Sequence, residues 1–469
     1  MAESRPNILW ITLESVRQDH TSLGEDERGT TPNIERIATS TDGIALQNCF
    51  AHARWTPAST ASMLTGTHLT THRVGYESDE VHQLPRELDT VPELLRTQGY
   101  RTGGLSSNSY LSSATGLDRG FDRFLWPDRY DALRNPTSVL RFLLKPERHR
   151  NLPMAAKQLN LTYELLTDVA KRWTEAFRGT GDPFFLYLHY NTPHHPYRPP
   201  HGILDERLQG TGLTPTEAIQ TARNVTENMW EVMANGCDLT DRERTSLQAT
   251  YDAAIAYVDR LVGDLVDDVL SSGRGDTVIV ITGDHGELFG EQGVLGHNLV
   301  LDDGLLNVPM VVHGFDDLTH TVGSQDLVQH IDVMQTLVTA TGCSTSQFQG
   351  IDLRKDTRDA VLAQRGPRPG DIDRLLENNP QFEADRFHTG LLDAIRTDSF
   401  KYVESDEGAE LYRLPDETTD VSKDHPAEND RLAARLNEYR SERSGHPEDR
   451  QRADFSDAMR AQLKDMGYI

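Results

Sequence analysis

Four residues whose side chains can bind a metal ion or attack an ester stand just after apolar segments of the sequence. They are Glu14, Thr56, Asp284 and His285. Open α/β sheets bind their ligands at the carboxyl ends of the strands, so residues that follow different strands meet at one edge. Two carboxylates, an imidazole and a hydroxyl suit a divalent ion such as Mn²⁺ or Zn²⁺. The sequence therefore predicts that these residues bind one metal ion, although each carboxylate alone also fits a surface loop or a helix cap.

Thr56 also has the sequence context of a nucleophile at the start of a helix. It is followed by Pro57 and by the helix-forming segment Ala58–Leu64, and a proline at the first helical position marks a helix N-terminus. In one interpretation Thr56 only caps that helix. In the other, the partial positive charge of the helix N-terminus and an adjacent metal ion stabilise the threonine alkoxide, which makes Thr56 a nucleophile.

The segments that must position these residues alternate between buried strands and amphipathic helices. Continuous apolar runs, typical of strands buried on both faces of a parallel sheet, occur at Ile8–Leu13, Ile44–Phe50, Phe184–Leu188, Thr277–Ile281 and Pro309–Val312. Between two of them, Ala253–Leu270 carries its apolar residues on one helical face. This alternation predicts a layered α/β fold.

Two regions depart from the alternation. Residues of about 125–180 are helical in pattern and mixed in charge, which indicates a helical insertion. From about residue 355 the chain is polar and rich in Asp, Glu and Arg. The elements expected there are two short strands and a charged helix, at Phe400–Val403, Glu410–Leu414 and near Asp430–Arg443. We therefore predict a catalytic domain over residues 1–354 and a smaller α+β subdomain with a charged helical tail over residues 355–469.

The net charge of −26 describes the solvent-facing surface. Of the 47 basic residues, only seven are lysine. A carboxylate-rich, lysine-poor surface is typical of a halophilic protein, although an ordinary acidic cytosolic protein gives a similar composition. In either case the acidic surface argues against nucleic acid as a partner, because phosphate backbones are bound by patches of Lys and Arg.

The three cysteines and the apolar segments bear on where the protein functions. Cys49, Cys237 and Cys343 are far apart and match no metal-binding spacing, so no disulfide framework is expected. The N-terminus lacks the basic and apolar regions of a signal peptide, and no apolar stretch reaches the ~18 residues of a membrane span. We therefore expect a cytoplasmic protein without a membrane span; its oligomeric state is not indicated.

Several motifs, in the same order along the chain, resemble those of the sulfatase family of the alkaline phosphatase superfamily. They are Arg5–Ile8 with Arg17–His20, Trp55–Thr56 with Ser62–Gly66 and His72, and Thr282–Glu287 with Gly296–His297. The resemblance extends from about residue 5 to residue 430. It implies an alkaline phosphatase-like fold, which is a three-layer α/β/α sandwich around a large mixed, mostly parallel sheet. It also implies a metal-dependent hydrolase acting on a small-molecule or glycan ester.

The nucleophile position departs from that of sulfatases, which carry a Cys or Ser that is converted to formylglycine. Here that position is Thr56, the proline is shifted to Pro57, and Thr60 stands where the family has an arginine. We therefore expect no formylglycine. The four predicted metal ligands instead resemble the single-metal site of lipoteichoic-acid synthases and phosphoethanolamine transferases, in which the threonine carries a phospho intermediate.

We therefore expect hydrolysis of a phosphate mono- or diester, or of a sulfate ester, through a covalent intermediate on Thr56. A threonine ester must be released by a second attack on phosphorus or sulfur, which is natural for phosphoryl groups, so phosphoesters are favoured. His297 is expected to donate a hydrogen bond or proton to the leaving oxygen, and His194 to do the same or to bind the nonbridging oxygens. Asn108 is a predicted substrate-binding residue, and the metal ion is Mn, Zn, Mg or Ca.

Three alternatives remain at this point. The first is a phospho-group transferase, of the phosphoglycerol or phosphoethanolamine type, acting on a soluble or glycan acceptor. The second is a true sulfuric ester hydrolase that uses threonine. The third is an inert binding protein that retains the fold.

Overall fold

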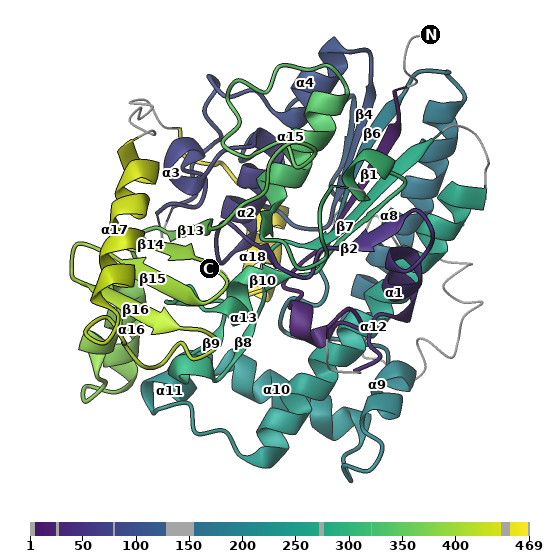
Figure 1. The fold of residues 1–469 in the computed structure, drawn as a ribbon. Coiled ribbons are helices and arrows are strands. Elements are labelled where there is room, and N and C mark those ends of the chain that lie inside the picture. The colour runs from purple at the N-terminus through teal and green to yellow at the C-terminus, as the bar shows by residue number, and fades with distance from the viewer. Residues whose placement is uncertain are drawn as a thin grey trace.

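A seven-stranded sheet forms the centre of the computed structural model, which describes residues 5–24, 28–77, 80–127, 154–271, 276–319, 321–441 and 451–467. In spatial order its strands are β2 (Gly43–Ala45), β11 (Met310–His313), β7 (Thr277–Gly283), β1 (Asn7–Leu13), β6 (Phe184–Tyr190), β4 (Arg101–Ser106) and β5 (Arg123–Leu125). β11 runs antiparallel to both of its neighbours, and the other six strands are parallel to one another. The predicted mixed, mostly parallel sheet is confirmed (Figure 1).

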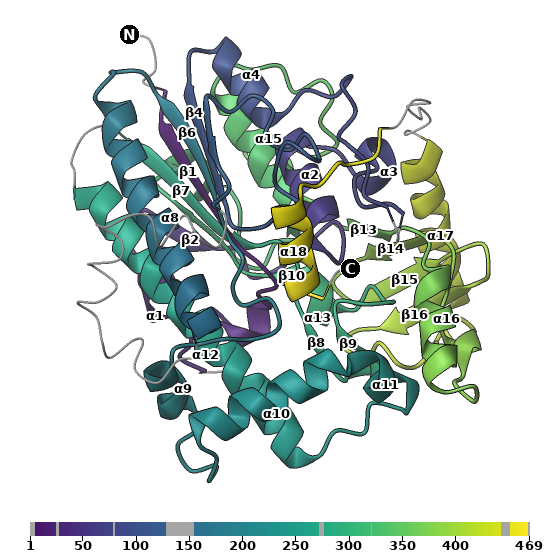
Figure 2. The same ribbon diagram turned by 180° about the vertical axis from the view of Figure 1, so that it is seen from behind.

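Helices cover both faces of this sheet. Successive residues of β1 point to opposite faces: Leu9 and Ile11 join one apolar core, and Ile8 and Trp10 join the other. The first face is covered by α1 (Pro32–Ala38), α8 (Met154–Arg178) and α12 (Asp241–Ser271), and the second by α2 (Thr56–Thr65), α4 (Val91–Thr97) and α15 (His330–Ala340). Figure 2 shows α8 and α12 on one side of the sheet and α4 and α15 on the other. The protein is therefore an α/β/α sandwich.

Shorter helices and strands complete this part of the fold. The helices are α3 (Leu69–His72), α9 (His201–Arg207), α10 (Pro215–Glu227), α11 (Met229–Ala234), α13 (Asp303–Leu306) and α14 (Asp316–Thr319). The strands are β8 (Leu288–Phe289) and β9 (Leu295–Gly296), which pair with each other, and β3 (Cys49–Phe50), β10 (Asn307–Val308) and β12 (Val328–Gln329), which form a three-stranded sheet.

The prediction of one strand over Ile44–Phe50 is wrong. β2 ends at Ala45 and pairs with β11, whereas β3 belongs to the three-stranded sheet. Between them, the amide of Leu46 still bonds to the carbonyl of Met310, but the amide of Gln47 bonds to Ser324. The chain changes partners within one apolar run, and the hydrophobic pattern carries no sign of that change.

The C-terminal region contains a second, antiparallel sheet. Its strands are β13 (Val361–Arg365), β14 (Leu392–Arg396), β15 (Phe400–Glu404) and β16 (Ala409–Arg413), and its helices are α16 (Pro369–Asn378) and α17 (Pro426–Ser441). The two predicted strands correspond to β15 and β16, and the predicted charged helix corresponds to α17, which packs on β14 and β15. The domain boundary between residues 354 and 355 stays a prediction.

Two further segments complete the chain. Within the predicted helical insertion, residues 128–153 lie outside the described ranges, and the segment that follows them is α8, which packs on β4 and β6. The last helix, α18 (Asp457–Asp465), lies apart from the C-terminal sheet, across the central region of the molecule (Figure 2).

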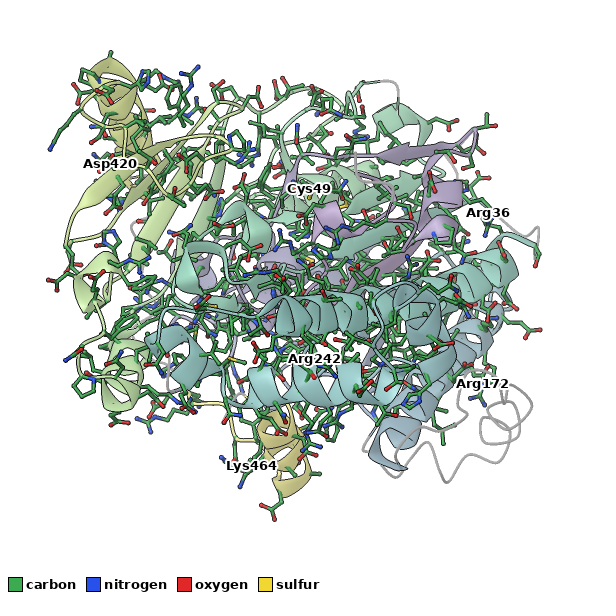
Figure 3. All side chains as sticks on the ribbon, turned by 90° about the horizontal axis from the view of Figure 1, so that it is seen from below. Arg36, Cys49, Arg172, Arg242, Asp420 and Lys464 are labelled. Carbon is green, nitrogen blue, oxygen red and sulfur yellow. The ribbon has the colours of Figure 1, made fainter. Side chains whose placement is uncertain are left out.

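The surface is charged, as the composition predicts. The five charged residues labelled in Figure 3 are all exposed, whereas Cys49 is buried. Cys237 and Cys343 are buried as well, and all three thiols are free. Among the described helices, none combines the length and apolar character needed to cross a bilayer.

Candidate active site

Thr56 is the first residue of α2 and is fully buried. The helix begins one residue earlier than expected: Trp55, in an extended conformation, is the N-cap, and Pro57 occupies the second position of the first turn. The Thr56 Oγ1 atom lies 3.3 Å from Nε2 of His285. The hydroxyl is thus held at the positive end of a ten-residue helix and beside an imidazole.

Asp284 and His285 follow β7 directly, and both are fully buried. Asp284 Oδ1 accepts hydrogen bonds from the backbone amides of Ser15 and His285, each at 2.9 Å. Its other oxygen, Oδ2, has no hydrogen-bond partner in the described structure and lies 3.6 Å from His285 Nε2. His285 Nδ1 is 2.8 Å from the carbonyl oxygen of Gly286, which fixes the proton on Nδ1 and leaves the lone pair on Nε2.

These atoms fit a divalent cation. A buried carboxylate oxygen without a hydrogen bond is costly unless a cation or a water molecule compensates it. Asp284 Oδ2 and Thr56 Oγ1 lie 3.6 and 3.3 Å from the same atom, His285 Nε2, so a carboxylate, an imidazole and a hydroxyl are neighbours here. The backbone carbonyl that accepts from His285 Nδ1 is the kind of outer contact that orients metal-binding imidazoles.

Glu14 stands next to this group but makes different contacts. Because Leu13 of β1 pairs in parallel with Gly283 of β7, Glu14 and Asp284 leave neighbouring strand ends. The two Glu14 oxygens accept hydrogen bonds from Asn108 Nδ2 at 3.0 and 2.9 Å, and Oε2 lies 3.0 Å from Nε2 of His189. Burial alone would raise the pKa of Glu14, but the hydrogen bond from His189 and the charge of nearby histidines lower it to about 2. Glu14 is therefore an anion in the interior.

The structure thus places Asn108 and Glu14 together, and Thr56 with the Asp284–His285 pair. Asn108 was predicted to bind substrate, and its amide nitrogen here donates to Glu14 while its oxygen accepts from the backbone of Tyr110. His189, to which the sequence assigned no role, orients the same carboxylate.

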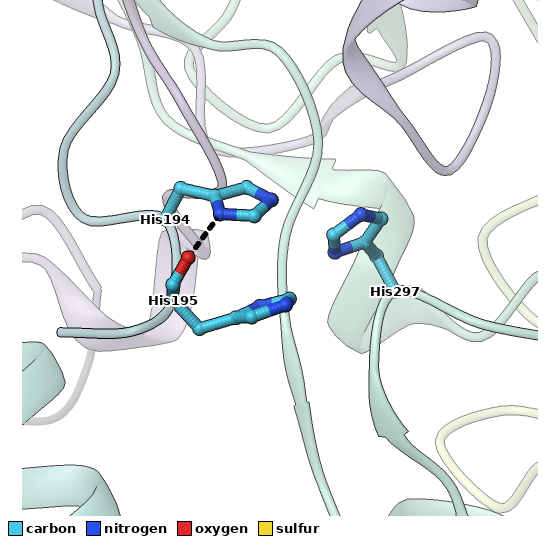
Figure 4. A group of neighbouring side chains, drawn as sticks. All are labelled: His194, His195 and His297. Carbon is cyan, nitrogen blue, oxygen red and sulfur yellow. Dashed lines mark hydrogen bonds between the residues drawn. The ribbon is translucent and has the colours of Figure 1, made fainter. Parts of the chain in front are cut away.

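The predicted histidines His194 and His297 lie in a second group, together with His195 (Figure 4). His194 and His195 follow β6, and His297 follows β9. One ligand atom from each of the three side chains lies within 4.8 Å of the others, and all three residues are buried. The rings of His297 and His285 are 4.9 Å apart, so the two groups adjoin. Burial lowers the pKa of His194 to about 4 and that of His297 well below its usual value, so both rings are neutral at pH 7.

Glu287 lies behind this second group and was missed in the sequence. It is fully buried, with Oε2 3.4 Å from Nδ1 of His195 and Oε1 3.5 Å from Nδ1 of His297. Burial opposes its ionisation, but His195 and His297 hold its pKa well below the usual range. The one sequence feature that could have indicated a role for Glu287 is its position two residues after His285. Its two histidine partners come from loops whose positions the sequence does not predict.

Two arginines lie on one side of the site, and α18 borders it on another. The guanidinium carbons of Arg54 and Arg368 lie 5.9 and 4.9 Å from the ring centre of Trp55, and all three residues are buried. Arg54 also donates to the carbonyl oxygen of His297. From α18, Gln462 donates to the carbonyl oxygen of Ser107, next to Asn108.

A mostly parallel sheet between two helix layers, with carboxylate, imidazole and hydroxyl groups at the carboxyl ends of its strands, defines an alkaline phosphatase-like α/β protein. The sulfatase family model matches residues 6–343, more than half of the chain. This chain belongs to the sulfatase family.

Two curated sulfatases share about a quarter of the aligned residues with this chain. The chain is 24% identical over 335 residues to arylsulfatase K of Xenopus laevis, covering 66% of this chain and 58% of the relative. It is 25% identical over 324 residues to iduronate 2-sulfatase of Homo sapiens, covering 61% and 56%. The matches thus span less than two thirds of these curated relatives.

Solved structures share the fold over nearly the whole chain. The phosphonate monoester hydrolase of Agrobacterium radiobacter matches with a TM-score of 0.71 at 22% identity, covering 94% of this chain and 96% of that protein. At this identity the likeness establishes the architecture.

Proposed function

We propose that this protein is a metal-dependent hydrolase of phosphate or sulfate esters that uses Thr56 as its nucleophile, with phosphoesters preferred. The observation that carries the proposal is the position of the Thr56 hydroxyl. It lies at the first residue of α2, fully buried, 3.3 Å from His285 Nε2 and beside the Asp284 carboxylate. Family membership supports ester hydrolysis as the reaction class.

Asp284, His285 and Thr56 would hold the metal ion, with Glu14 as the fourth ligand. In the described structure Glu14 bonds to Asn108 and His189, so binding through Glu14 requires its carboxylate to exchange one of these contacts. A divalent cation at this place supplies positive charge that stabilises both the threonine alkoxide and the oxygens of the ester.

The proposed reaction is a double displacement. Thr56 Oγ attacks the phosphorus in line, the bond from phosphorus to the ester oxygen breaks, and the alcohol departs with a proton. Water then attacks the phosphothreonine, the bond from phosphorus to Thr56 Oγ breaks, and phosphate leaves with the threonine restored. The N-terminus of α2 favours the negative charge that develops next to Thr56 in both steps.

The second group of histidines supports the departure of the alcohol. His297 and His194 face the Thr56 side of the site, with the His297 ring 4.9 Å from that of His285. Either imidazole, once protonated, would stabilise the leaving oxygen by a hydrogen bond or a proton. Asn108 holds Glu14 in place and would also reach a phosphoryl oxygen if Glu14 turned toward the metal ion.

The preference for phosphate follows from the threonine. A formylglycine hydrate expels sulfate by breaking its own carbon–oxygen bond, whereas a threonine ester lacks that route and must be cleaved at phosphorus or sulfur. Attack at phosphorus is the established course of such reactions. None of the three cysteines stands at the nucleophile position, and all three are buried elsewhere.

The decisive experiment compares aryl esters. Metal-reconstituted protein should hydrolyse 4-nitrophenyl phosphate or bis(4-nitrophenyl) phosphate faster than 4-nitrophenyl sulfate. Thr56→Ala should lower kcat by at least about 10³-fold, as expected for loss of a nucleophile. Quenched wild type should carry a phosphoryl group on the peptide containing Thr56, detected by mass spectrometry.

The matched control is Thr60→Ala, which removes another fully buried hydroxyl from α2, one turn further along. It should retain activity within a few-fold. A sulfate preference above about a hundredfold would reverse the proposed substrate order, and equal activity of Thr56→Ala and wild type would remove Thr56 as the nucleophile. Adding glycerol to the assay tests the transferase alternative, because transfer yields glycerol phosphate in place of free phosphate.

We also propose that the surface is adapted to high salt. Support comes from the net charge of −26 and from the small number of lysines. Screening of carboxylate repulsion by salt should raise the melting temperature between 0.2 and 2 M KCl. A melting temperature that falls over this range would contradict the proposal.

A further inference from the structure

Three buried imidazoles meet beside the proposed nucleophile without forming part of the predicted metal site. His194 and His195 approach from the loop after β6, and His297 approaches from the segment after β9 (Figure 4). One ligand atom of each lies within 4.8 Å of those of the other two. Each side chain is at least nine-tenths buried.

The outer contacts of these rings are those that orient metal ligands. Nδ1 of His194 faces the carbonyl oxygen of His195. Nδ1 of His195 and Nδ1 of His297 lie 3.4 and 3.5 Å from the two oxygens of Glu287. A neutral imidazole that donates from Nδ1 has its lone pair on Nε2, the atom that binds metal. A carboxylate or backbone carbonyl on the other ring nitrogen is the usual companion of such a ligand.

This group is separate from the Thr56 group but adjoins it. His285 and His297 have their rings 4.9 Å apart, and His194 Nε2 lies 3.9 Å from Glu14 Oε1. Glu14, which leaves the strand next to that of Asp284, is thus also close to the histidine group. Two metal positions that share one edge of the sheet suit phosphoryl transfer, in which attacking and leaving oxygens both carry negative charge.

We propose that His194, His195 and His297 bind a second divalent cation, with Glu287 as the carboxylate that orients two of the three ligands. Three nitrogen donors favour zinc or a similar transition metal over Mg²⁺ or Ca²⁺, which prefer oxygen. Tetrahedral coordination with bonds of ~2.1 Å holds ligand nitrogens about 3.4 Å apart, so ligand atoms that are now up to 4.8 Å apart must approach one another when the ion binds.

This inference goes beyond the proposed function and does not depend on Thr56. It changes how His194 and His297 act, because a ring nitrogen that binds an ion does not donate a proton. The proton-donor role and the second metal site therefore exclude each other for these two residues, and the number of bound ions separates them.

The test is the metal content of the full-length protein. Protein freed of metal by a chelator is incubated with excess Zn²⁺, desalted and analysed by inductively coupled plasma mass spectrometry. We expect two zinc ions per wild-type chain, and one per chain for both His195→Ala and Asp284→Asn. His201→Ala, which removes a histidine of α9 outside the group, should retain two. Circular dichroism confirms that each variant is folded.

If His195→Ala does not fold, the wild-type and Asp284→Asn counts decide the matter together: two ions and one ion support the second site, and one ion and none overturn it. A single ion that is retained by His195→Ala and lost from Asp284→Asn would overturn the second site. So would a single ion lost from both variants, because one shared ion would then occupy the space between the groups. Co²⁺ gives a second readout: wild type should show more d–d absorbance than His195→Ala, and equal spectra would contradict the proposal. None of these results depends on whether Thr56→Ala is active, so a failure here is distinct from a failure of the proposed function.

Discussion

The two halves of the site are held in place by different parts of the fold. Thr56 is the first residue of a helix, and Asp284 directly follows a central strand, so regular backbone hydrogen bonds fix both positions. His194 and His297 lie on irregular segments, and their rings are oriented by a carbonyl and by a buried carboxylate. The first half is fixed by secondary structure, whereas the second depends on tertiary contacts that meet only in the finished fold.

The largest expected effect comes from removing the negative charge of Asp284 in the first half of the site. Asp284→Asn keeps the shape of the side chain but removes the negative oxygen that has no hydrogen bond. Loss of one group that stabilises charge in the transition state costs about 10³-fold in kcat, and the protein should also bind one metal ion fewer. Steady-state kinetics on an aryl phosphate together with metal analysis measures both. Glu227→Gln, on the exposed side of α10, is the control and should behave as wild type; wild-type kinetics in Asp284→Asn would contradict the metal role of Asp284.

How much of each half could be predicted follows from this difference. Glu14 and Asp284 follow apolar runs that form β1 and β7, and the parallel pairing of Leu13 with Gly283 brings them together. A residue at the end of a central strand can be placed without predicting the conformation of any loop. The position of each residue after a buried strand was sufficient to predict that Glu14 and Asp284 lie at the same edge of the sheet. The predicted sheet is confirmed.

The imidazole half shows where sequence reasoning ends. His194 and His297 were proposed through a resemblance, but the roles of His195 and Glu287 were not, because the contact between His195 and Glu287 joins segments 92 residues apart. The same limit explains the error over Ile44–Phe50. Hydrophobicity predicts that a segment is buried, and it does not specify which strand is its partner.

The second prediction tests whether Glu287 supports the imidazole half as its contacts indicate. Glu287→Gln preserves size but removes the charge beside His195 and His297, so their orientation is weakened. Loss of such an outer contact costs about 10–100-fold in activity or metal affinity. The loss should be smaller than in Asp284→Asn and should spare the ion bound there. A Glu287→Gln enzyme as inactive as Asp284→Asn, with no metal left, would show that the two halves bind as one unit.

The third prediction uses a buried histidine that belongs to the scaffold. His72 lies in α3, where Nδ1 accepts from the Val74 amide and Nε2 contacts Ser62 Oγ at 3.0 Å. Burial lowers its pKa from 6.5 to about 3, so below pH 6.5 the unfolded chain binds a proton that the folded chain does not. The contribution of neutral, buried His72 to the free energy of unfolding is therefore complete above pH 6.5. It falls as the pH decreases toward 3, by about 2 kcal/mol at pH 5.

Urea unfolding at pH 7 and pH 5, in the presence of a chelator, measures this loss. His72→Gln should be less stable at pH 7 but should lose about 2 kcal/mol less than wild type between the two pH values. Both nitrogens of His72 are engaged by the protein, so added zinc should leave its contribution unchanged. An equal pH dependence in His72→Gln and wild type would contradict the assigned cause.

The smallest expected effect concerns the support that α18 gives to the loops of the site. Gln462 accepts from the hydroxyl of Ser109 and donates to the carbonyl of Ser107, on either side of Asn108. Gln462→Ala removes both contacts at a cost of about 0.5–1.5 kcal/mol each. Because Asn108 orients Glu14, we expect kcat/KM to fall by about 2- to 10-fold while metal content stays at the wild-type value. Arg460→Ala, on the same helix and exposed, is the control and should not change the rate. Loss of metal from Gln462→Ala would contradict this expectation. It would show that α18 supports the Asp284 half of the site, which it reaches through Asn108 and Glu14.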